Sequence, residues 1–347
     1  MRLRPALVMV ALAAEAAAWA APSRAETKAE PDCRTFEPRP IGRGTTATPR
    51  APQRGAPWQP PRRFEHVLIV VLENQDYDTV VRHPYFRALA RRGTMFTHFN
   101  GLFHPSYANY LALIGGKFFG TIKDDQKDIP RSERTIADLL EAKGLTWRQF
   151  AEGYPGHCYT GSSASGSLYQ RKHVPFMSFE SITKDPARCA RVVSADRFDR
   201  TDLPSFALYS PDMCHDGHDV CGGALDRVKG WIGDIPGAGR IGVGSRELDQ
   251  AAEWLRGFLE PILADPAVMK DTLVVVTFDE SEDGANNHIY TVFLGGMVNA
   301  GAEIDACYDH YNLLRTVEDN FGLGTLGAED ERSVPITGSL WRAGSGP

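Results

Sequence analysis

Residues 66–72 read His-Val-Leu-Ile-Val-Val-Leu, and residues 272–278 read Thr-Leu-Val-Val-Val-Thr-Phe. Both are short apolar runs with few polar residues, which is typical of strands buried on both faces of a parallel sheet. Further strands are expected at 146–151, 205–209 and 290–294. Helical patterning predicts helices at 78–92, 132–143, 248–263 (broken near its end by Pro261) and 310–321. This alternation predicts an α/β fold with a doubly wound, mostly parallel central sheet and helices on both faces.

The chain before the first strand divides into two parts. A basic start, an alanine- and valine-rich stretch and Ser23-Arg24-Ala25 predict that residues 1–25 are a secretory signal peptide, cleaved near Ala25. Residues 26–63 are rich in Pro and Arg and lack an apolar period, so we expect an extended arm or linker. Residues 64–347 are then expected to form a single domain. No stretch reaches 18 apolar residues, so no transmembrane segment is predicted.

Charge and cysteine usage narrow the class of protein. The 347-residue chain has a formal net charge of −6, which becomes −8 if Arg2, Arg4, Arg24 and Glu15 leave with the signal peptide. This mild acidity argues against nucleic-acid binding. Six cysteines in an exported chain predict disulfides, and the sequence leaves 15 pairings open. Cys214 and Cys221 flank a polar loop that they could brace together, and Cys33 could pin the arm to the domain.

Polar pairs follow both of the strongest strands. Glu73-Asn74 comes directly after the first, and Asp279-Glu280 directly after the second. The carboxyl ends of parallel strands meet at one edge of the sheet, where ligands bind in such folds. Each pair alone is equally compatible with an acidic turn, but three carboxylates and an amide in one place would repel one another without a cation. Oxygen ligands of this kind suit Mg²⁺, Ca²⁺ or Mn²⁺.

A serine lies at a predicted helix start. Residues 104–116 read His-Pro-Ser-Tyr-Ala-Asn-Tyr-Leu-Ala-Leu-Ile-Gly-Gly, so a short helix is expected with Ser106 in its first turn. Unpaired backbone N–H groups and the helix dipole would stabilise a phosphate or a serine alkoxide there. The position equally suits a serine that only caps the helix, and both interpretations stay open.

Three polar clusters carry the histidines of interest. Residues 211–219 include Asp216 and His218 and follow a predicted strand, residues 286–288 end in His288 and precede another, and Asp309-His310 opens the last helix. An isolated histidine is more often structural than catalytic. His104 and His173 are weaker candidates on this ground.

Five sequence blocks resemble the phosphoesterase family of secreted acid phosphatases and phospholipases C, within the alkaline-phosphatase-like superfamily. In family order they are HVLIVVLENQDYD, HPSYANYLALIGG, SPDMCHDGHD, TFDESEDGANNHIYTVFLGG and YDHYNLLRTVEDNFGLGTLG. They span about residues 66–327, nearly the whole predicted domain. The resemblance implies that residues 64–347 are a phosphoesterase domain.

The resemblance also implies roles for particular residues. Glu73, Asn74, Asp279 and Glu280 match metal ligands of the family, Ser106 matches a nucleophile that also touches the metal, and Asn109 matches a phosphate contact. Asp216, His218 and His288 match positions that hold a second metal in the wider superfamily or contact phosphate or the leaving group, and His310 matches a pocket residue. Ala108 replaces a proline that is common in related blocks. Glu280 replaces a histidine of the wider superfamily, which favours one oxygen-liganded ion over two zinc ions.

The resemblance implies an exported, metal-dependent phosphoesterase that hydrolyses phosphate monoesters of small substrates through a phosphoserine. The metal is a divalent ion, Mg²⁺, Ca²⁺, Mn²⁺ or Zn²⁺. A phospholipase C or other phosphodiesterase is the alternative, because the metal chemistry would be the same. A non-catalytic phosphate-binding module is a third interpretation, since a fold does not by itself fix a function. Nothing in the sequence indicates the oligomeric state.

Overall fold

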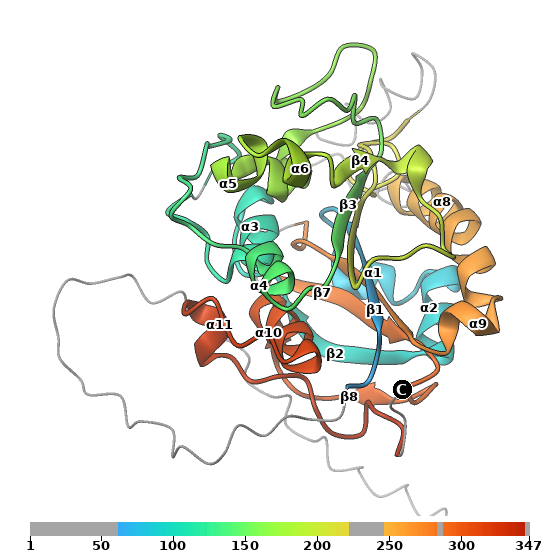
Figure 1. Ribbon diagram of the computed structural model, residues 1–347. Coiled ribbons are helices and arrows are strands. Elements are labelled where there is room, and N and C mark those ends of the chain that lie inside the picture. Colours follow the sequence, from blue (N-terminus) through green and yellow to red (C-terminus); the bar gives the residue numbers. More distant parts are fainter. Residues whose placement is uncertain (1–61, 122, 222–245, 283–286, 344–347) are drawn as a thin grey trace, which may run out of the picture. The chain divides into compact units, whose positions relative to one another are not determined.

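A nine-stranded mixed sheet organises the computed structural model, which describes residues 62–121, 123–221, 246–282 and 287–343 (Figure 1). All of these residues belong to one compact unit that spans residues 31–347. The expectations for Cys33 and for residues 1–25 fall outside the described residues. The strands are β1 (His66–Leu72), β2 (Thr94–Asn100), β3 (Trp147–Ala151), β4 (Val192–Ser194), β5 (Phe206–Ser210), β6 (Thr272–Phe278), β7 (His288–Leu294), β8 (Glu303–Ile304) and β9 (Tyr308–Asp309).

The two strands that decide the fold lie side by side at the centre of the sheet. The strand order is β4-β3-β5-β1-β6-β7-β2-β8, with β9 also paired to β2. β1 runs parallel to β5 and to β6, in a register that pairs Leu72 with Phe278. β7 is antiparallel to both of its neighbours, β6 and β2. The prediction of a mostly parallel sheet is therefore confirmed, and β2, β4, β8 and β9 are strands that the apolar pattern did not indicate.

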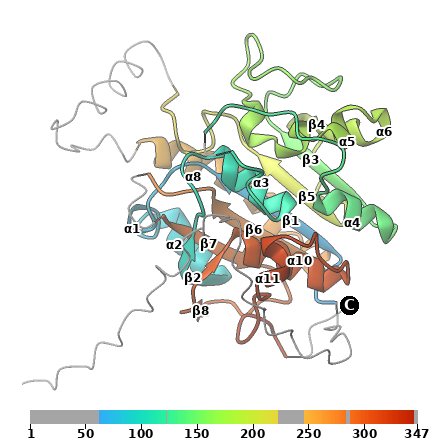
Figure 2. The same cartoon turned by 90° about the vertical axis from the view of Figure 1, so that its left-hand side faces the viewer.

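Helices lie on both sides of the sheet in the two ribbon views (Figures 1 and 2). In Figure 1, α3 (Tyr107–Gly115), α4 (Ile136–Ala142) and α10 (His310–Phe321) lie to its left, while α2 (Pro84–Arg92) and α8 (Arg246–Leu263) lie to its right. The short elements are α1 (Tyr77–Val80), α5 (Glu180–Thr183), α6 (Pro186–Cys189), α9 (Pro266–Met269), α11 (Glu329–Arg332), η2 (Arg171–His173), η3 (Pro175–Ser178) and η4 (Ala195–Arg197).

Three of the predicted helices differ from those observed. The helix expected at 78–92 is two helices, because Pro84 disfavours a helical conformation for His83, whose ring Nδ1 instead accepts from the Tyr85 N–H at 3.2 Å to cap α2. The helix expected at 132–143 begins at Ile136, where Thr135 and Asp138 form a capping box. α8 continues through Pro261 to Leu263, so the break expected there is wrong.

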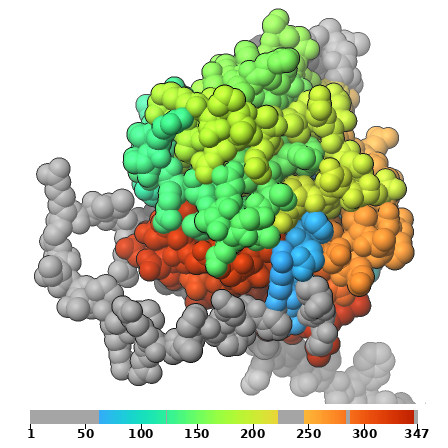
Figure 3. All heavy atoms as spheres, in the orientation of Figure 1, coloured from blue at the N-terminus to red at the C-terminus, as the bar shows by residue number. Residues whose placement is uncertain are grey.

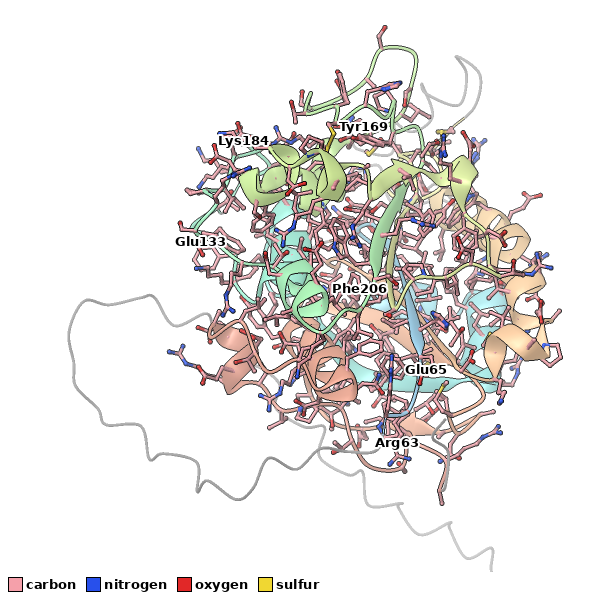
Figure 4. All side chains as sticks on the ribbon, in the orientation of Figure 1. Arg63, Glu65, Glu133, Tyr169, Lys184 and Phe206 are labelled. Atoms are coloured by element: carbon pink, nitrogen blue, oxygen red, sulfur yellow. A yellow bond between two sulfur atoms is a disulfide. The ribbon has the colours of Figure 1, made fainter. Side chains whose placement is uncertain are left out.

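The centre of the sheet is fully buried. Val67–Leu72 of β1 and Leu273–Val276 of β6 have at most 1% exposure. On the face shown in the space-filling view, the blue segment that contains β1 is visible as a narrow band between green and orange segments (Figure 3). Arg63 and Glu65 lie at the lower end of the sheet, where β1 begins, and Tyr169 lies at the upper end (Figure 4). The carboxyl ends of the central strands therefore point towards the upper end.

Two disulfides join cysteines within the described residues. Cys158 pairs with Cys189, and Cys214 pairs with Cys221, as expected for the second pair. Cys307 is also disulfide-bonded. Such bonds persist in oxidising compartments, which indicates export from the cytosol. No helix in the described part of the chain is both long and apolar enough to cross a membrane.

Candidate active site

The two polar pairs meet at the carboxyl ends of β1 and β6. Because Leu72 pairs with Phe278, the next residues, Glu73 and Asp279, are neighbours at the sheet edge. Both carboxylates are buried, with 0% and 1% exposure. Asn74 has φ 39°, in the left-handed region that asparagine tolerates better than most residues, and its N–H donates to Asp279 Oδ1 at 3.3 Å. The carboxylates therefore lie together at the carboxyl edge of the sheet, as the sequence predicts.

Ser106 lies directly before α3 and points into this group. Its Oγ lies 3.0 Å from Glu73 Oε2, 3.2 Å from Glu280 Oε1 and 3.4 Å from Asn74 Oδ1. Its side chain makes no capping hydrogen bond to the helix, so the interpretation of Ser106 as a simple helix cap is wrong. The hydroxyl is instead surrounded by oxygen acceptors from two separate strand ends, and it is buried.

Asn109 shares the helix face of Ser106, but its amide is already occupied. Its Oδ1 accepts from the backbone N–H groups of Leu102 and Phe103 at 2.8 and 3.0 Å. Its Nδ2 donates to the Phe103 carbonyl at 2.8 Å and to Glu280 Oε2 at 3.3 Å. Asn109 therefore fixes the loop before α3 and orients Glu280, a role that the sequence did not indicate.

His173 lies on the other side of Glu73 and links it to Asp216. Its Nε2 lies 2.9 Å from Glu73 Oε1, and its Nδ1 lies 3.9 Å from Asp216 Oδ2. All three side chains are buried, and their ligand atoms lie within 4.8 Å of one another, as in a metal site. The ring stacks on Tyr110 at 5.2 Å. His173 was only a weak candidate in the sequence because it stands in no motif.

Burial and mutual repulsion govern the protonation of these carboxyls. Burial raises the pKa of both Asp216 and Asp279 well above the ordinary value, and the negative charge of Glu73 raises both further. Burial also acts to raise the pKa of Glu73, but the neighbouring His173 outweighs it and lowers that pKa to about 2. Burial raises the pKa of Glu280, and His104 partly offsets this.

The donor set fits a divalent cation. Asp279 Oδ2 and Asp216 Oδ2 are buried and have no hydrogen-bond partner within the described residues. Glu73, Asn74, Ser106 and Glu280 bring further oxygens to the same place, which suits a hard cation. A cation would also remove the repulsion that raises the pKa of Asp279. His173 adds a nitrogen ligand beside Glu73, so the site also offers the mixed set that zinc or manganese accepts.

Two partly exposed histidines border the site. His104 Nδ1 lies 3.0 Å from Glu280 Oε2, and 34% of the His104 side chain is exposed. The backbone N–H of His218 donates to Asp216 Oδ1 at 3.0 Å, and the ring Nδ1 of His218 lies 3.2 Å from Asp219 Oδ1. The contact with Asp219 raises the pKa of His218 to about 9, despite the opposing effect of burial. The His104 ring therefore contacts Glu280 directly, whereas the His218 ring is paired with Asp219.

His288 and His310 occupy different surroundings. The His288 ring stacks on Tyr77 at 4.0 Å and on His98 at 5.8 Å, and it shares a face of β7 with Tyr290, whose hydroxyl donates to the Phe86 carbonyl of α2. Ser106, in contrast, directly precedes α3, which lies on the other side of the sheet from α2 (Figure 1). His310 is buried at the start of α10, and its Nε2 lies 2.8 Å from the carbonyl oxygen of Asp279. It therefore supports the site through the Asp279 backbone.

A family model for the phosphoesterase family matches residues 80–226 and 244–324, which is more than half of the chain. The chain belongs to the phosphoesterase family. The matched region contains Ser106, Asn109, His173, Asp216, Asp279 and Glu280, whereas Glu73 and Asn74 lie just before it.

Several characterised or named proteins and one solved structure are similar to the chain. A probable acid phosphatase of Kluyveromyces lactis is 32% identical over 280 residues, which cover 77% of this chain and 60% of that protein. A phosphatidylinositol-3-phosphatase of Mycobacterium tuberculosis is 30% identical, with 80% and 83% coverage. A solved alkaline phosphatase superfamily protein of Vibrio parahaemolyticus has a TM-score of 0.53, 13% identity and coverage of 80% and 72%, which supports the fold alone. The chain spans about 60% of the length of the fungal acid phosphatases that it matches.

Proposed function

We propose that the protein is an exported, metal-dependent phosphoesterase that hydrolyses phosphate monoesters through a phosphoserine at Ser106. The observation that carries this proposal is the position of the Ser106 hydroxyl, which is buried and within 3.4 Å of Glu73, Asn74 and Glu280. A structural serine at a helix start would have capped the helix instead. Relatives that are themselves named acid phosphatase or phosphatidylinositol-3-phosphatase support hydrolysis of monoesters.

Glu73, Asn74, Asp279 and Glu280 would hold the ion, together with the Ser106 hydroxyl. When bound, a divalent cation lowers the pKa of the serine hydroxyl and stabilises negative charge on the phosphoryl oxygens. The oxygen-rich donor set favours Mg²⁺, Ca²⁺ or Mn²⁺, and the nitrogen of His173 keeps Zn²⁺ in consideration. A second ion between Glu73, His173 and Asp216 would replace the second site that the sequence assigned to Asp216, His218 and His288.

Ser106 and His218 carry out the remaining steps of the proposed reaction. The Ser106 hydroxyl gives its proton to one of the carboxylates that accept its hydrogen bond, Glu73 or Glu280. Its Oγ attacks phosphorus opposite the departing oxygen, and the ester P–O bond breaks as the Ser–O–P bond forms. His218 gives a proton to the leaving alcohol, and a water molecule then cleaves the phosphoserine to release phosphate. We favour His218 for this step because its side chain is partly exposed and its backbone N–H contacts Asp216, which brings the residue to the border of the site. His104 is the alternative donor, and the stacked position of His288 makes it a weaker one.

The wider predictions for the chain are part of the same proposal. Residues 1–25 would be removed near Ala25, residues 26–63 would form an arm, and residues 64–347 would form one phosphoesterase domain in the periplasm or outside the cell. The sheet would be doubly wound about β1, since β3, β4 and β5 lie on one side of it and β6 lies on the other. The substrate would be a small phosphorylated molecule.

Replacing Ser106 by Ala tests the proposal. We expect hydrolysis of p-nitrophenyl phosphate to fall at least about a thousandfold, because the covalent route is lost, and the labelled phosphoserine trapped by acid quench to disappear. Ser132→Ala changes an exposed serine and serves as the control. Activity that survives in Ser106→Ala would refute the nucleophile. Faster hydrolysis of phosphatidylcholine or bis-p-nitrophenyl phosphate than of monoesters would favour the phosphodiesterase alternative, and no turnover with any added metal would favour the binding module.

A further inference from the structure

A carboxylate from a neighbouring loop lies where α3 begins. Asp124 Oδ1 accepts a hydrogen bond from the backbone N–H of Tyr107 at 3.2 Å. Tyr107 follows Ser106 directly, so this N–H is one of the unpaired donors at the helix N-terminus that can receive an anion. In the structure that donor is taken by a side chain rather than by the Ser106 hydroxyl.

The second oxygen of the same carboxylate meets a cation. Asp124 Oδ2 accepts from Lys172 Nζ at 2.9 Å, and only 15% of the Lys172 side chain is exposed. Burial acts to lower the pKa of Lys172, but the negative charges of Glu73, Asp124 and Asp279 outweigh it and raise that pKa. The two Asp124 oxygens therefore each contact one donor at the edge of the Ser106 site.

Lys172 is held in position by its neighbours. Arg171 donates to the Met177 carbonyl, the Thr160 carbonyl and Asp128. His173 contacts Glu73, and its carbonyl accepts from Ser210 Oγ at 2.6 Å. Asp124, in contrast, has 37% of its side chain exposed. The cation is thus on a fixed segment, and the carboxylate can turn towards solvent without opening the core.

We propose that Lys172 and the Tyr107 N–H bind two non-bridging oxygens of the substrate phosphate, and that Asp124 occupies this position until the substrate displaces it. This inference rests on the proposed function. A carboxylate bridging an ammonium and a helix N–H reproduces the contacts that two phosphate oxygens would make. A monoester carries two negative charges near neutral pH and a diester carries one, so Lys172 also favours monoesters.

The experiment measures inorganic phosphate binding by calorimetry on the metal-loaded full chain, together with kcat/KM for p-nitrophenyl phosphate and bis-p-nitrophenyl phosphate. Asp124→Asn removes the competing charge, so phosphate should bind about tenfold more tightly. Asp125→Asn alters the adjacent exposed aspartate and should leave the phosphate affinity and both kcat/KM values unchanged. Lys172→Met should weaken phosphate binding about tenfold or more and lower the monoester-to-diester ratio. Lys172→Arg should restore part of the phosphate affinity and part of the monoester-to-diester ratio.

Each outcome bears on the inference. Unchanged phosphate affinity in Asp124→Asn would overturn the displacement, and equal losses for both esters in Lys172→Met would overturn the selectivity. Lys184→Met, at an exposed lysine paired with Glu180, controls for loss of a positive charge. Thermal unfolding identifies a variant that fails to fold, and Lys172→Arg then provides the comparison. If the wild-type chain binds phosphate but hydrolyses neither ester, the proposed function fails while the binding measurements still decide this inference.

Discussion

The backbone N–H of Glu73 donates a 2.8 Å hydrogen bond to the carbonyl oxygen of Asp216. This bond joins the end of β1 to a loop that the Cys214–Cys221 disulfide closes. Gln75 Nε2 adds a 2.8 Å bond to the Gly217 carbonyl. These bonds and the disulfide therefore fix the predicted metal ligand Glu73 relative to the loop that carries His218.

The two described disulfides should differ in what they protect. The Cys214→Ser/Cys221→Ser double variant should lose more activity, because the loop that bears Asp216 and His218 is released. The Cys158→Ser/Cys189→Ser variant should lose more stability, since its 31-residue separation exceeds the 7 residues of the other pair and longer closed loops stabilise more, up to about 3–4 kcal/mol. Thermal unfolding and kcat/KM, measured on both variants, check this. If Cys158→Ser/Cys189→Ser lost more activity and Cys214→Ser/Cys221→Ser lost more stability, the result would contradict the role of the loop in holding Asp216 and His218 in place.

Asn109→Ala should destabilise the protein as well as slow it. Removal of the amide leaves the Leu102 and Phe103 N–H groups without their acceptor and releases Glu280. Both N–H groups are partly buried, and leaving a fully buried group unsatisfied costs about 1–3 kcal/mol, which is the upper bound for each. The measurement is the unfolding free energy in urea. A loss of phosphate affinity with unchanged stability would instead support the phosphate contact that the resemblance implies.

Removal of the divalent ion should destabilise the protein most at neutral pH. A cation at a hundred times its Kd contributes about 2.7 kcal/mol, which chelation removes. In the ion-free protein the pKa values of Asp216 and Asp279 are raised in the folded state, so stability is lost as pH rises through those values. The ion-free melting temperature should therefore increase on acidification from pH 7 to pH 5, and added metal should restore it at pH 7. A melting temperature that does not change when a chelator is added would argue against a bound ion.

Glu318→Gln should stabilise the protein at alkaline pH. Burial, followed by the neighbouring Asp330, raises the pKa of Glu318 to about 10. The unfolded chain releases this proton near pH 4.5 and the folded chain retains it, so stability falls as pH rises between these values. The substitution removes that loss, and we expect a gain of at least about 1 kcal/mol at pH 8 and little change at pH 4. Glu331→Gln, at an exposed glutamate, is the control, and an equal effect of both variants would refute the assignment.

The sequence by itself determined the sheet, its central strands and the residues at their ends. Continuous apolar runs such as Val67–Leu72 can be buried only between layers, and a polar pair directly after a parallel strand must lie at the carboxyl edge. Glu73, Asp279 and Ser106 were accessible to this reasoning because each is fixed by local pattern. The split of the helix at Pro84 was also encoded locally, and closer attention to the residue before proline would have found it.

Only the tertiary structure decided which polar groups meet. His173, Lys172 and Asp124 stand in no local pattern. They come from segments about 20 to 70 residues from Ser106 in sequence, and they contact Glu73, the Tyr107 N–H and one another. Asn109 shares a helix face with Ser106, but its amide is used by Leu102, Phe103 and Glu280. The His288 ring stacks on the ring of Tyr77, because the His288 side chain points to the α2 side of β7. Periodicity fixes the burial of a side chain, but the partners of a buried polar atom depend on which distant segments the fold brings together.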